Sequence, residues 1–310
     1  MTLLIVSPDR PDLNRWQAAL QACAPDLDIE IWPQVTVREN ITFALVWQQP
    51  AGIWQKFPHL RCVSSFGAGV DHLLQDADLP TDIPIVRLVD PLLAQSMFEY
   101  IAAAVMGVLR DFDIYQGQQA AGLWQPHTPA LSQHCTVGIM GLGQLGTYTA
   151  QKLVKLGFNV VGWARSPKQI EGVTAYAGDS QLPQFLQQIQ ILVCLLPLTA
   201  QTRDILNLDL FAQLPRPAYL VNVARGAHLV DADLVQAIHV GYLRGACLDV
   251  FRQEPLPPTH PFWAHPKIRV TPHCSSITNP ESVAPQIVEN YRRSQVGEPL
   301  LNQVLRSRGY

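Results

Sequence analysis

The chain has 310 residues, 48% of them hydrophobic, which is enough to bury a large core and favours two domains over one. A formal net charge of -3 and a pI near 6.3 argue against a nucleic-acid partner. The six cysteines form no CxxC pair, so we expect neither a metal site nor a disulfide framework, and a reducing cytoplasm suits them best. The start of the chain lacks a basic segment with a long apolar run, and the most apolar helical stretch, residues 101–109, is too short to span a bilayer. We therefore expect no membrane partner.

The first part of the chain alternates short apolar runs with polar segments of helical character. The runs are residues 3–6, 29–32, 43–46, 62–65 and 85–88, with a helix expected over 13–22. This alternation predicts a small α/β domain with a parallel sheet. Two loops, at residues 47–50 and 64–72, follow strands and are expected at the carboxyl edge, where open α/β sheets bind ligands. In the second loop, Gly67 and Gly69 can present backbone N–H groups to a carboxylate, although such a glycine pair alone is more often a tight turn.

The middle of the chain predicts one long helix over residues 96–118. Met97, Ile101, Val105 and Val108 recur there at helical spacing, and we expect the helix to cross between the two domains. Beyond it, residues 122–129 have no period and contain two prolines, which predicts an extended arm or loop.

The most informative motif is GLGQLG at residues 141–146. An apolar run enters it, a helix closed by Gly157 leaves it, and a second apolar strand ends at Trp163, so the segment reads as a βαβ unit. In such a unit the first glycine permits a tight turn, the second permits close approach of a pyrophosphate, and the third permits close packing of helix on strand. Helix N–H groups and the helix dipole then favour the phosphates. The motif predicts dinucleotide binding rather than a turn that binds nothing.

The residues after the second strand indicate which dinucleotide binds. An NAD-binding unit usually places Asp or Glu about 20 residues beyond the glycines, where the carboxylate accepts from the ribose 2′-OH. This chain has WARSPK at residues 163–168 and no acidic residue before Glu171. Arg165 can pair with a 2′-phosphate through its planar guanidinium, Ser166 can donate a hydrogen bond, and Lys168 adds positive charge. We therefore expect NADP(H), although a solvated basic turn would have the same composition.

Four further apolar runs extend the nucleotide-binding unit into a larger doubly wound domain; they are residues 191–196, 219–223, 246–250 and 268–271. Asn279, Pro280 and Glu281 then form a helix start, and that last helix can return to the first domain. The expected fold class is α/β, with two doubly wound parallel-sheet domains. Residues 1–96 and 278–310 would form a discontinuous, flavodoxin-like substrate domain, and residues 97–277 a Rossmann NADP-binding domain.

Arg225, Glu254 and His273 each follow one of the last three apolar runs. Read singly, they have ordinary explanations: a strand-end arginine, a solvated loop carboxylate and a structural histidine. Because parallel strands of one sheet end at the same edge, all three are expected where the nicotinamide would lie. Reduction of a 2-oxo acid needs a cation for the carboxylate and the C2 carbonyl, and a proton donor near neutral pH. Glu254 can keep His273 protonated and fix its tautomer, and Asp249 can accept from the nicotinamide amide.

Taken in order, the motifs resemble those of the D-2-hydroxyacid dehydrogenases over essentially the whole chain. They are SFGAGVD at 65–71, GLGQLG at 141–146, NVARG at 222–226, DVF and EPL at 249–256, and TPH at 271–273. Within this family the chain is most similar to the glyoxylate/hydroxypyruvate reductases. That likeness rests on LVW at 45–47, WQP at 124–126, WARS at 163–166 and EPLPP at 254–258. The chain departs from the family at residues 274–277, where many members carry small residues. The resemblance therefore implies the chemistry but not the exact substrate preference.

The resemblance implies the same roles for the three strand-end residues: Arg225 orients the substrate, His273 is the acid/base and Glu254 supports it. It also implies that backbone amides at Ala68 and Gly69 bind the substrate carboxylate, with Trp47 walling a small pocket. The expected cofactor contacts are Gly141, Gly143, Gln144, Leu145, Gly146, Trp163, Arg165, Ser166, Leu196, Pro197, Val223, Ala224 and Asp249. Family members are typically dimers formed through the nucleotide domain, so we expect a homodimer with Trp124 on a segment that can reach the partner.

These observations predict a cytoplasmic, NADPH-dependent reductase that transfers hydride to C2 of glyoxylate or hydroxypyruvate, giving glycolate or D-glycerate. Two alternatives stay open at this point. One is an NADH-dependent D-2-hydroxyacid dehydrogenase acting on a bulkier 2-oxo acid. The other is a dinucleotide-sensing corepressor or scaffold, which can retain Arg225, Glu254 and His273 without using them in turnover.

Overall fold

The computed structural model describes residues 1–8 and 10–309, apart from the side chain of Arg308. It divides the chain into two compact units, the first made of Met1–Leu93 with Thr278–Tyr310 and the second of Ala94–Ile277. Residues 94–96, expected in the substrate domain, belong to the second unit. The C-terminal segment joins the first unit, so that unit is discontinuous in sequence.

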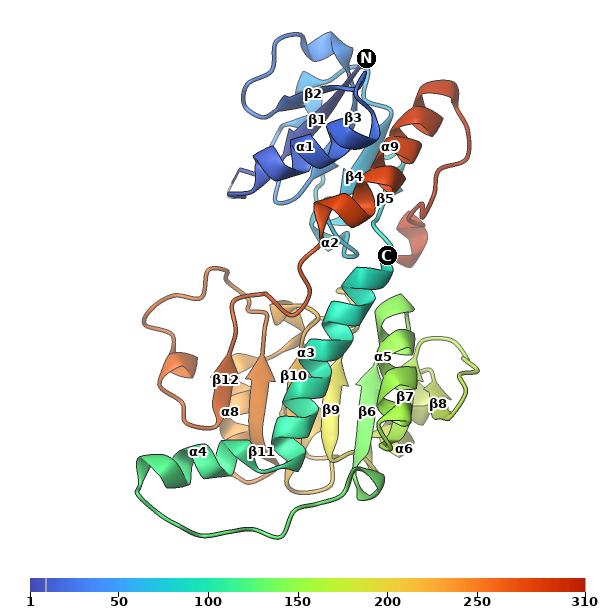
Figure 1. Ribbon diagram of the computed structural model, residues 1–310. Coiled ribbons are helices and arrows are strands. Elements are labelled where there is room, and N and C mark those ends of the chain that lie inside the picture. Colours follow the sequence, from blue (N-terminus) through green and yellow to red (C-terminus); the bar gives the residue numbers. More distant parts are fainter. Residues whose placement is uncertain (9, 310) are drawn as a thin grey trace. The chain divides into compact units, whose positions relative to one another are not determined.

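The first unit is built on a five-stranded sheet with the order β2-β1-β3-β4-β5, and each neighbouring pair of strands is parallel (Figure 1). This order is the flavodoxin-like one. The strands are β1 (Thr2–Val6), β2 (Asp28–Ile31), β3 (Ile41–Val46), β4 (Cys62–Ser65) and β5 (Ile85–Val86). The helices are α1 (Leu13–Cys23), α2 (Asp71–Leu74) and α9 (Pro280–Val296).

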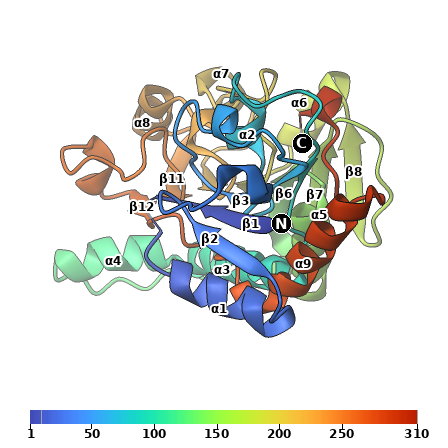
Figure 2. The ribbon, with the colours of Figure 1, turned by 90° about the horizontal axis from the view of Figure 1, so that it is seen from above.

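Both faces of the first sheet are buried, because successive side chains of a strand point to opposite faces. Leu3 and Ile5 of β1 pack into one core cluster with residues of α1 and α9, which lie side by side on that face (Figure 2). Leu4 and Val6 belong to the cluster on the other face. The apolar runs of this domain are therefore continuous rather than alternating.

The C-terminal helix α9 starts as the sequence indicates. The Asn279 side chain accepts the N–H of Glu281 at 2.9 Å, and Pro280 occupies the first turn, where its missing N–H costs nothing. The helix ends at Gly297, whose φ of 75° lies in the left-handed region. Arg15 of α1 donates to Glu281 at 2.8 Å, which ties α9 to the opening helix of the chain.

The second unit contains a seven-stranded sheet with the order β12-β11-β10-β9-β6-β7-β8, in which neighbouring strands are again parallel. Starting from β6, the chain winds first toward β8 and then, from β9, in the opposite direction, which is the doubly wound Rossmann arrangement. Its strands are β6 (Thr136–Met140), β7 (Asn159–Ala164), β8 (Val173–Ala177), β9 (Ile191–Cys194), β10 (Ala218–Asn222), β11 (Leu243–Leu248) and β12 (Ile268–Val270). The predicted fold class is confirmed.

Helices cover both faces of the second sheet (Figure 1). One core cluster joins the sheet to α3 and α5, and the other joins it to α6, α7 and α8. These helices, with α4, are α3 (Pro91–Leu109), α4 (Phe112–Ala120), α5 (Gln144–Lys155), α6 (Leu182–Leu186), α7 (Leu208–Phe211) and α8 (Asp231–His239). Strand β8 has no counterpart among the predicted strands, because it lies at the sheet edge and its side chains are mostly half-buried rather than apolar and enclosed.

The prediction of one helix over residues 96–118 is wrong in two respects. The helix begins earlier, at Pro91, and it ends at Leu109, after which Asp111 adopts a left-handed φ of 56° and α4 begins. With 19 residues, α3 is long and apolar enough to cross a membrane, so the expectation that this stretch is too short is also wrong. Its residues Ile101 and Val105 are fully buried against the sheet of the second unit, as in the core helix of a globular domain.

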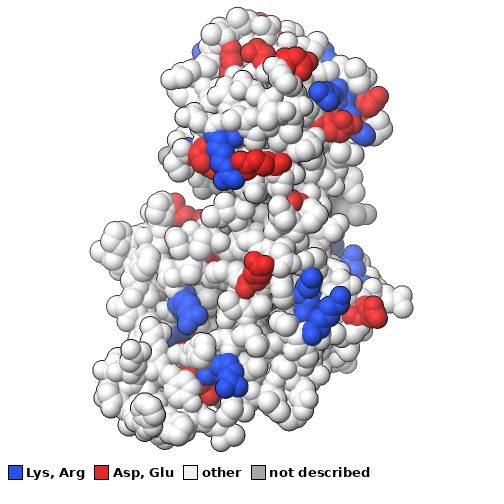
Figure 3. All heavy atoms as spheres, viewed as in Figure 1, with Lys and Arg blue, Asp and Glu red and all other residues white. Residues whose placement is uncertain are grey.

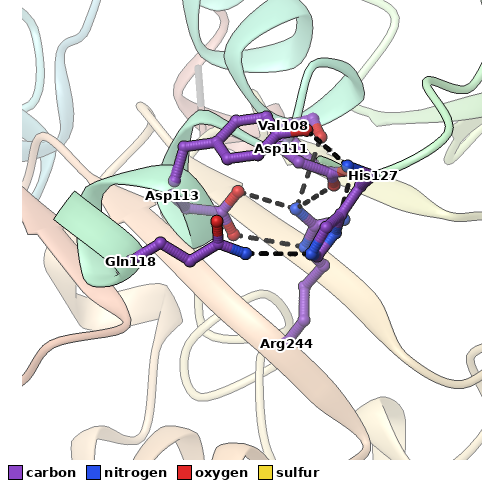
Figure 4. A network of polar contacts seen from close by, with 7 residues as sticks. Val108, Asp111, Asp113, Gln118, His127 and Arg244 are labelled. Atoms are coloured by element: carbon purple, nitrogen blue, oxygen red, sulfur yellow. Dashed lines mark hydrogen bonds and ion pairs between the residues drawn. The ribbon is translucent and has the colours of Figure 1, made fainter. Parts of the chain in front are cut away.

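Arg244 of β11 explains why the helix breaks at Asp111 (Figure 4). Its guanidinium donates to Asp111 at 2.9 Å and to Asp113 at 2.6 Å, so both carboxylates are drawn to one point. Burial alone lowers the pKa of Arg244, but its hydrogen bonds to the two carboxylates and their negative charges outweigh burial and raise the pKa above its usual value. His127 of the following arm contacts Asp111 and Gln118, which fixes the predicted irregular segment against α4.

Charged side chains are scattered over the molecular surface. On the face drawn in Figure 3, Lys and Arg occur in small groups beside Asp and Glu rather than as one continuous basic surface. This distribution agrees with the net charge of -3 and offers no extended track for a polyanion on that face.

Candidate active site at the carboxyl edge of the second sheet

Each glycine of the turn between β6 and α5 suits its position for a different steric reason. Gly141 has a φ of +104°, and a Cβ there would lie 2.6 Å from the Leu195 carbonyl oxygen. A Cβ on Gly146 would lie 1.9 Å from the Gly141 carbonyl oxygen, so this glycine permits the close packing of helix on strand. A Cβ on Gly143 would meet nothing within 4 Å, which marks the position where the backbone is open to a ligand. This is the cradle expected for a pyrophosphate.

The end of β7 fits a cofactor that carries a 2′-phosphate. The strand ends at Ala164 without an acidic side chain, and Arg165, Ser166 and Lys168 are all exposed. Gln144 at the start of α5 is exposed and Leu145 half-buried, so both also lie at the surface of the turn. The residues present therefore suit NADP(H) rather than a cofactor with a free ribose 2′-OH.

Several of the residues predicted to contact the cofactor are buried. Trp163 is 6% exposed, and its indole N–H donates to the Gly178 carbonyl at 2.9 Å, so its side chain serves the core. Leu196, Val223 and Ala224 are also buried at the ends of β9 and β10, while Pro197 is half-buried. The contacts expected for these residues stay predictions. Close approach to a cofactor there would involve mainly backbone atoms.

Arg225 is held by two buried polar residues of its own loop. The Asn222 side chain accepts the N–H of Ala224 at 3.2 Å and donates to the Arg225 carbonyl at 3.1 Å. The fully buried His228 ring accepts the Arg225 N–H at Nδ1, 3.2 Å away, and its Nε2 lies 3.3 Å from the Pro197 carbonyl oxygen. A neutral imidazole with its proton on Nε2 makes both bonds. His228 therefore positions the arginine loop.

The arginine loop lies directly against the loop that carries Glu254. A Cβ on Gly226 would lie 1.9 Å from the Phe251 carbonyl carbon, so only a glycine allows the two backbones to approach this closely. Arg252 donates to the Leu229 carbonyl at 2.8 Å, which fastens the same two loops together, and its ion pair with Asp204 ties them to the segment between β9 and α7.

Glu254 and His273 form a direct pair, as predicted. Glu254 Oε2 lies 2.7 Å from His273 Nδ1, and Oε1 accepts the Phe251 N–H at 2.9 Å. The two side chains remain about one quarter and one third exposed, at 26% and 34%. The carboxylate thus fixes the orientation of the ring through Nδ1, and the acid/base role of His273 stays a prediction.

Asp249 has a different environment from the one expected of a nicotinamide contact. Its carboxylate is fully buried and accepts the Thr271 hydroxyl at 2.6 Å, the Cys274 N–H at 2.9 Å and the Ser275 N–H at 2.8 Å. The Asp249 carbonyl accepts the N–H of His273 at 2.8 Å. Asp249 is therefore the centre around which the histidine loop is wrapped, and its contact with a cofactor stays a prediction.

Apart from Arg225, the residues predicted for substrate binding belong to the first unit, where Ala68 and Gly69 lie in the loop after β4 and Trp47 directly follows β3. Ser65 donates to the Gly69 carbonyl at 2.7 Å and accepts the Gly67 N–H at 3.2 Å, which folds the residues around Ala68 into a tight turn. The Trp47 ring contacts the ring of His72 at a tilt of 54°, with centroids 4.6 Å apart. The substrate contacts of Trp47, Ala68 and Gly69 stay predictions.

Sequence reasoning missed the residues that hold the site rather than form it. Asn222, His228 and Thr271 are the main ones, and each acts through hydrogen bonds to the backbone or to a buried carboxylate. Asn222 and Thr271 lie within the recognised motifs, so a search for buried polar residues beside the three strand-end residues would have found them. His228 carries no such signal, because a lone histidine beyond a motif has many explanations.

Comparisons with known proteins agree with this geometry. The family described as D-isomer specific 2-hydroxyacid dehydrogenase, NAD binding domain, matches residues 102–275. Glyoxylate/hydroxypyruvate reductase A of Yersinia enterocolitica is 42% identical over 304 residues, covering 96% of this chain and 97% of that protein. The enzyme of the same name from Serratia proteamaculans is 43% identical over 290 residues, covering 92% of each.

Solved structures are similar over the whole chain. A D-isomer specific 2-hydroxyacid dehydrogenase from Xanthobacter autotrophicus Py2, in complex with NADPH and MES, gives a TM-score of 0.95 at 42% identity, covering 100% of this chain and 99% of that one. The NADPH-dependent glyoxylate/hydroxypyruvate reductase of Sinorhizobium meliloti, in complex with NADP and sulfate, gives 0.91 at 35% identity, covering 100% of both chains.

Proposed function

The chain belongs to the D-isomer specific 2-hydroxyacid dehydrogenase family, and from this premise we propose that it is an NADPH-dependent reductase of glyoxylate and hydroxypyruvate. The products are glycolate and D-glycerate. The observation that carries this proposal is the pairing of His273 with Glu254 at 2.7 Å, in a loop packed against that of Arg225. The relatives named for this activity, and the NADPH-bound neighbour, support it over the NADH-dependent and corepressor alternatives.

The residues proposed for cofactor binding and catalysis follow strands of the second unit that end at one sheet edge. Strands β10, β11 and β12 are parallel neighbours, and the loops after them carry Arg225, Glu254 and His273. The glycine turn follows β6, which lies at the same edge because β9 connects it in parallel to β10. A cofactor bound along the turn thus extends toward the three side chains.

NADPH, when bound, supplies the hydride that adds to C2 of the 2-oxo acid. Arg225 binds the substrate carboxylate and carbonyl oxygen through its planar guanidinium, which orients C2 and draws electron density toward the oxygen. His273 gives the proton on Nε2 to that oxygen as the C2–O double bond becomes a single bond, which completes the hydroxyl group. Glu254 holds the imidazole in place through Nδ1 while the proton is transferred. His273 then regains a proton from solvent, to which it is partly exposed.

Loss of NADPH absorbance on adding glyoxylate or hydroxypyruvate tests the proposal, with NADH run in parallel at the same concentration. We expect rapid oxidation of NADPH and much slower oxidation of NADH. Turnover with NADH alone would contradict the cofactor assignment and leave the chemistry intact. No turnover with either small substrate, but turnover with a bulkier 2-oxo acid, would contradict the substrate assignment. Tight NADPH binding without turnover of any oxo acid would favour the sensing protein.

We also propose that the enzyme is a homodimer formed through the second unit. Trp124 is 96% exposed in the single chain, and Phe112, Leu123 and Leu131 of the same region are each more than half exposed. An exposed apolar patch of this kind is typical of a protein interface. Sedimentation should give the mass of a dimer for the wild type and a weaker dimer for Trp124→Ala. A monomeric wild type would contradict this proposal without affecting the reductase assignment.

The cysteines support a cytoplasmic location. All six are free thiols, and Cys62, Cys135, Cys194 and Cys247 are buried. Burial raises the pKa of Cys135 to about 11 and that of Cys194 to about 12, so these thiols remain protonated and unreactive. Free cysteines are usual in a reducing compartment. Recovery of the protein from a non-cytoplasmic fraction of its cells would contradict this location.

A further inference from the structure

Tyr100 of α3 is connected to the catalytic histidine loop through a chain of hydrogen bonds. Its hydroxyl lies 2.5 Å from Thr271 Oγ1 and 3.3 Å from Cys247 Sγ. Thr271 in turn donates to Asp249 at 2.6 Å. The chain therefore runs from a helix that forms part of the core to the buried carboxylate beneath His273.

The direction of these hydrogen bonds follows from the groups themselves. A carboxylate only accepts, so the one hydroxyl proton of Thr271 points to Asp249. Thr271 Oγ1 can then only accept from Tyr100, whose own proton must point to Thr271. The Cys247 thiol can donate to the Tyr100 oxygen, which completes the order Cys247, Tyr100, Thr271, Asp249. Burial raises the pKa of Tyr100 well above its usual value, so its hydroxyl remains a donor at any pH at which the enzyme works.

Asp249 transmits this order to the histidine loop. Its two carboxylate oxygens accept the N–H groups of Cys274 and Ser275, the two residues after His273. His273 itself has a φ of 52°, in the left-handed region that residues other than glycine seldom adopt. Such a conformation persists only where surrounding contacts determine it, and here Asp249 accepts the N–H groups of His273, Cys274 and Ser275.

We propose that Tyr100 is a positioning residue that acts on His273 through Thr271 and Asp249, and so keeps the imidazole in line with Glu254 and the substrate carbonyl. This inference rests on the proposed reductase function for its kinetic consequence. The hydrogen-bond chain itself is independent of that function, since every member belongs to the second unit and none of Tyr100, Thr271 or Cys247 is assigned a role in binding the substrate.

Tyr100→Phe removes the hydroxyl and retains the ring that packs in the core. Because a small displacement of a catalytic group is costly, we expect kcat to fall about tenfold, with the KM values for NADPH and glyoxylate little changed. Tyr219→Phe is the matched control, since Tyr219 is a buried tyrosine of the same core cluster, and we expect it to keep wild-type kcat. A loss of general core stability would affect the two variants alike.

A double-variant cycle shows whether Tyr100 and Thr271 act on His273 in series or independently. Thr271→Val removes the central hydroxyl at nearly constant shape, and we expect it to lower kcat at least as much as Tyr100→Phe. If the two residues act in series, adding Tyr100→Phe to Thr271→Val causes no further loss. Losses that multiply would contradict the inference.

Hydrogen exchange gives a readout that does not depend on activity. The amides of Cys274 and Ser275, protected by Asp249 in the wild type, should exchange faster in Tyr100→Phe and at the wild-type rate in Tyr219→Phe. Unchanged exchange in Tyr100→Phe would overturn the inference that hydrogen bonds connect Tyr100 to the histidine loop, even if the wild type is an active reductase. Faster exchange with unchanged kcat would overturn the proposal that Tyr100 positions His273 for turnover. An inactive wild type would contradict the proposed function. The exchange data would still decide whether the series of hydrogen bonds from Tyr100 to Asp249 holds the histidine loop.

Discussion

His273 Nδ1 lies 2.7 Å from Glu254 Oε2, although the two residues are 19 positions apart in the sequence. The second oxygen of the same carboxylate accepts the Phe251 N–H at 2.9 Å, so Glu254 is fixed from its own loop as well. The histidine ring is therefore oriented by a carboxylate that is itself held in place, as the proposed proton transfer requires.

Glu254→Gln tests the function of this pair. Glutamine keeps the shape but removes the carboxylate that holds His273 through Nδ1, so we expect kcat to fall by about 10- to 100-fold with NADPH affinity unchanged. The variant Gln253→Glu adds a carboxylate one position away, in the exposed part of the loop, and serves as a control for charge alone. Wild-type kcat in Glu254→Gln, measured with saturating NADPH and glyoxylate, would show that His273 needs no carboxylate partner.

Arg165 is predicted to determine the preference for NADPH. Replacing it with alanine removes a charge-assisted hydrogen bond to the 2′-phosphate, which is worth about 1.5–3 kcal/mol, or roughly 10- to 100-fold in affinity. We expect the KM for NADPH to rise accordingly while the KM for NADH stays constant. Lys168→Ala, in the same exposed turn, should have a smaller effect. Equal changes for the two cofactors in Arg165→Ala would refute the 2′-phosphate contact.

The glycine turn offers a pair of substitutions with opposite expected results. Gly143→Ala meets nothing within 4 Å, so the protein should fold with wild-type stability and yet bind NADPH weakly, because the methyl group occupies the approach to the phosphates. Gly146→Ala would place a carbon 1.9 Å from a backbone oxygen and should lower the melting temperature markedly. Thermal unfolding and NADPH titration of both variants separate the two roles. Wild-type NADPH affinity in Gly143→Ala would argue against the cradle.

We predict that Asp76 of the first unit makes a pH-dependent contribution to stability. Burial alone raises its pKa, but hydrogen bonds from Gln49 at 2.7 Å and Trp54 at 2.8 Å, and from the Asp78 N–H, outweigh burial and lower the pKa of Asp76. A carboxyl group whose pKa is lower in the folded chain than in the unfolded chain stabilises the fold at neutral pH, and this stabilisation is lost as the pH falls through the lowered pKa.

We therefore expect Asp76→Asn to lower the free energy of unfolding by about 1–2 kcal/mol at pH 7, and by less at pH 3. Urea unfolding at both pH values measures the difference. Asp78→Asn is the control, since its side chain is exposed and only its backbone N–H takes part. A cost for Asp76→Asn that is the same at both pH values would mean that its charge is not involved.

Local patterns in the sequence predicted the fold, and they predicted that Arg225, Glu254 and His273 follow strands that end at one sheet edge. Glycines at positions 141, 143 and 146 are dictated by backbone geometry, and the ends of parallel strands necessarily share an edge. These features depend on local sequence and on the handed winding of α/β folds, so Arg225 and His273 could be assigned to one edge without a structure.

Features that depend on distant contacts could not be predicted in this way. The helix break at Asp111 is set by Arg244, which lies 133 positions away and contributes no local signal. The partners of Asp249 arise only when the histidine loop wraps around it, and a carboxylate at a strand end can equally face a ligand. Strand β8 is half-exposed at a sheet edge, so its apolar pattern is too weak to identify.

Turnover by the His273→Gln variant tests the central assignment most directly. NADPH oxidation with glyoxylate is measured beside NADPH binding, followed by the fluorescence of the bound cofactor, in the wild type and the variant. We expect a fall in kcat of about 10²- to 10⁴-fold with NADPH affinity retained, because the proposed general acid is removed and the cofactor cradle is untouched. Near-wild-type turnover in His273→Gln would contradict it.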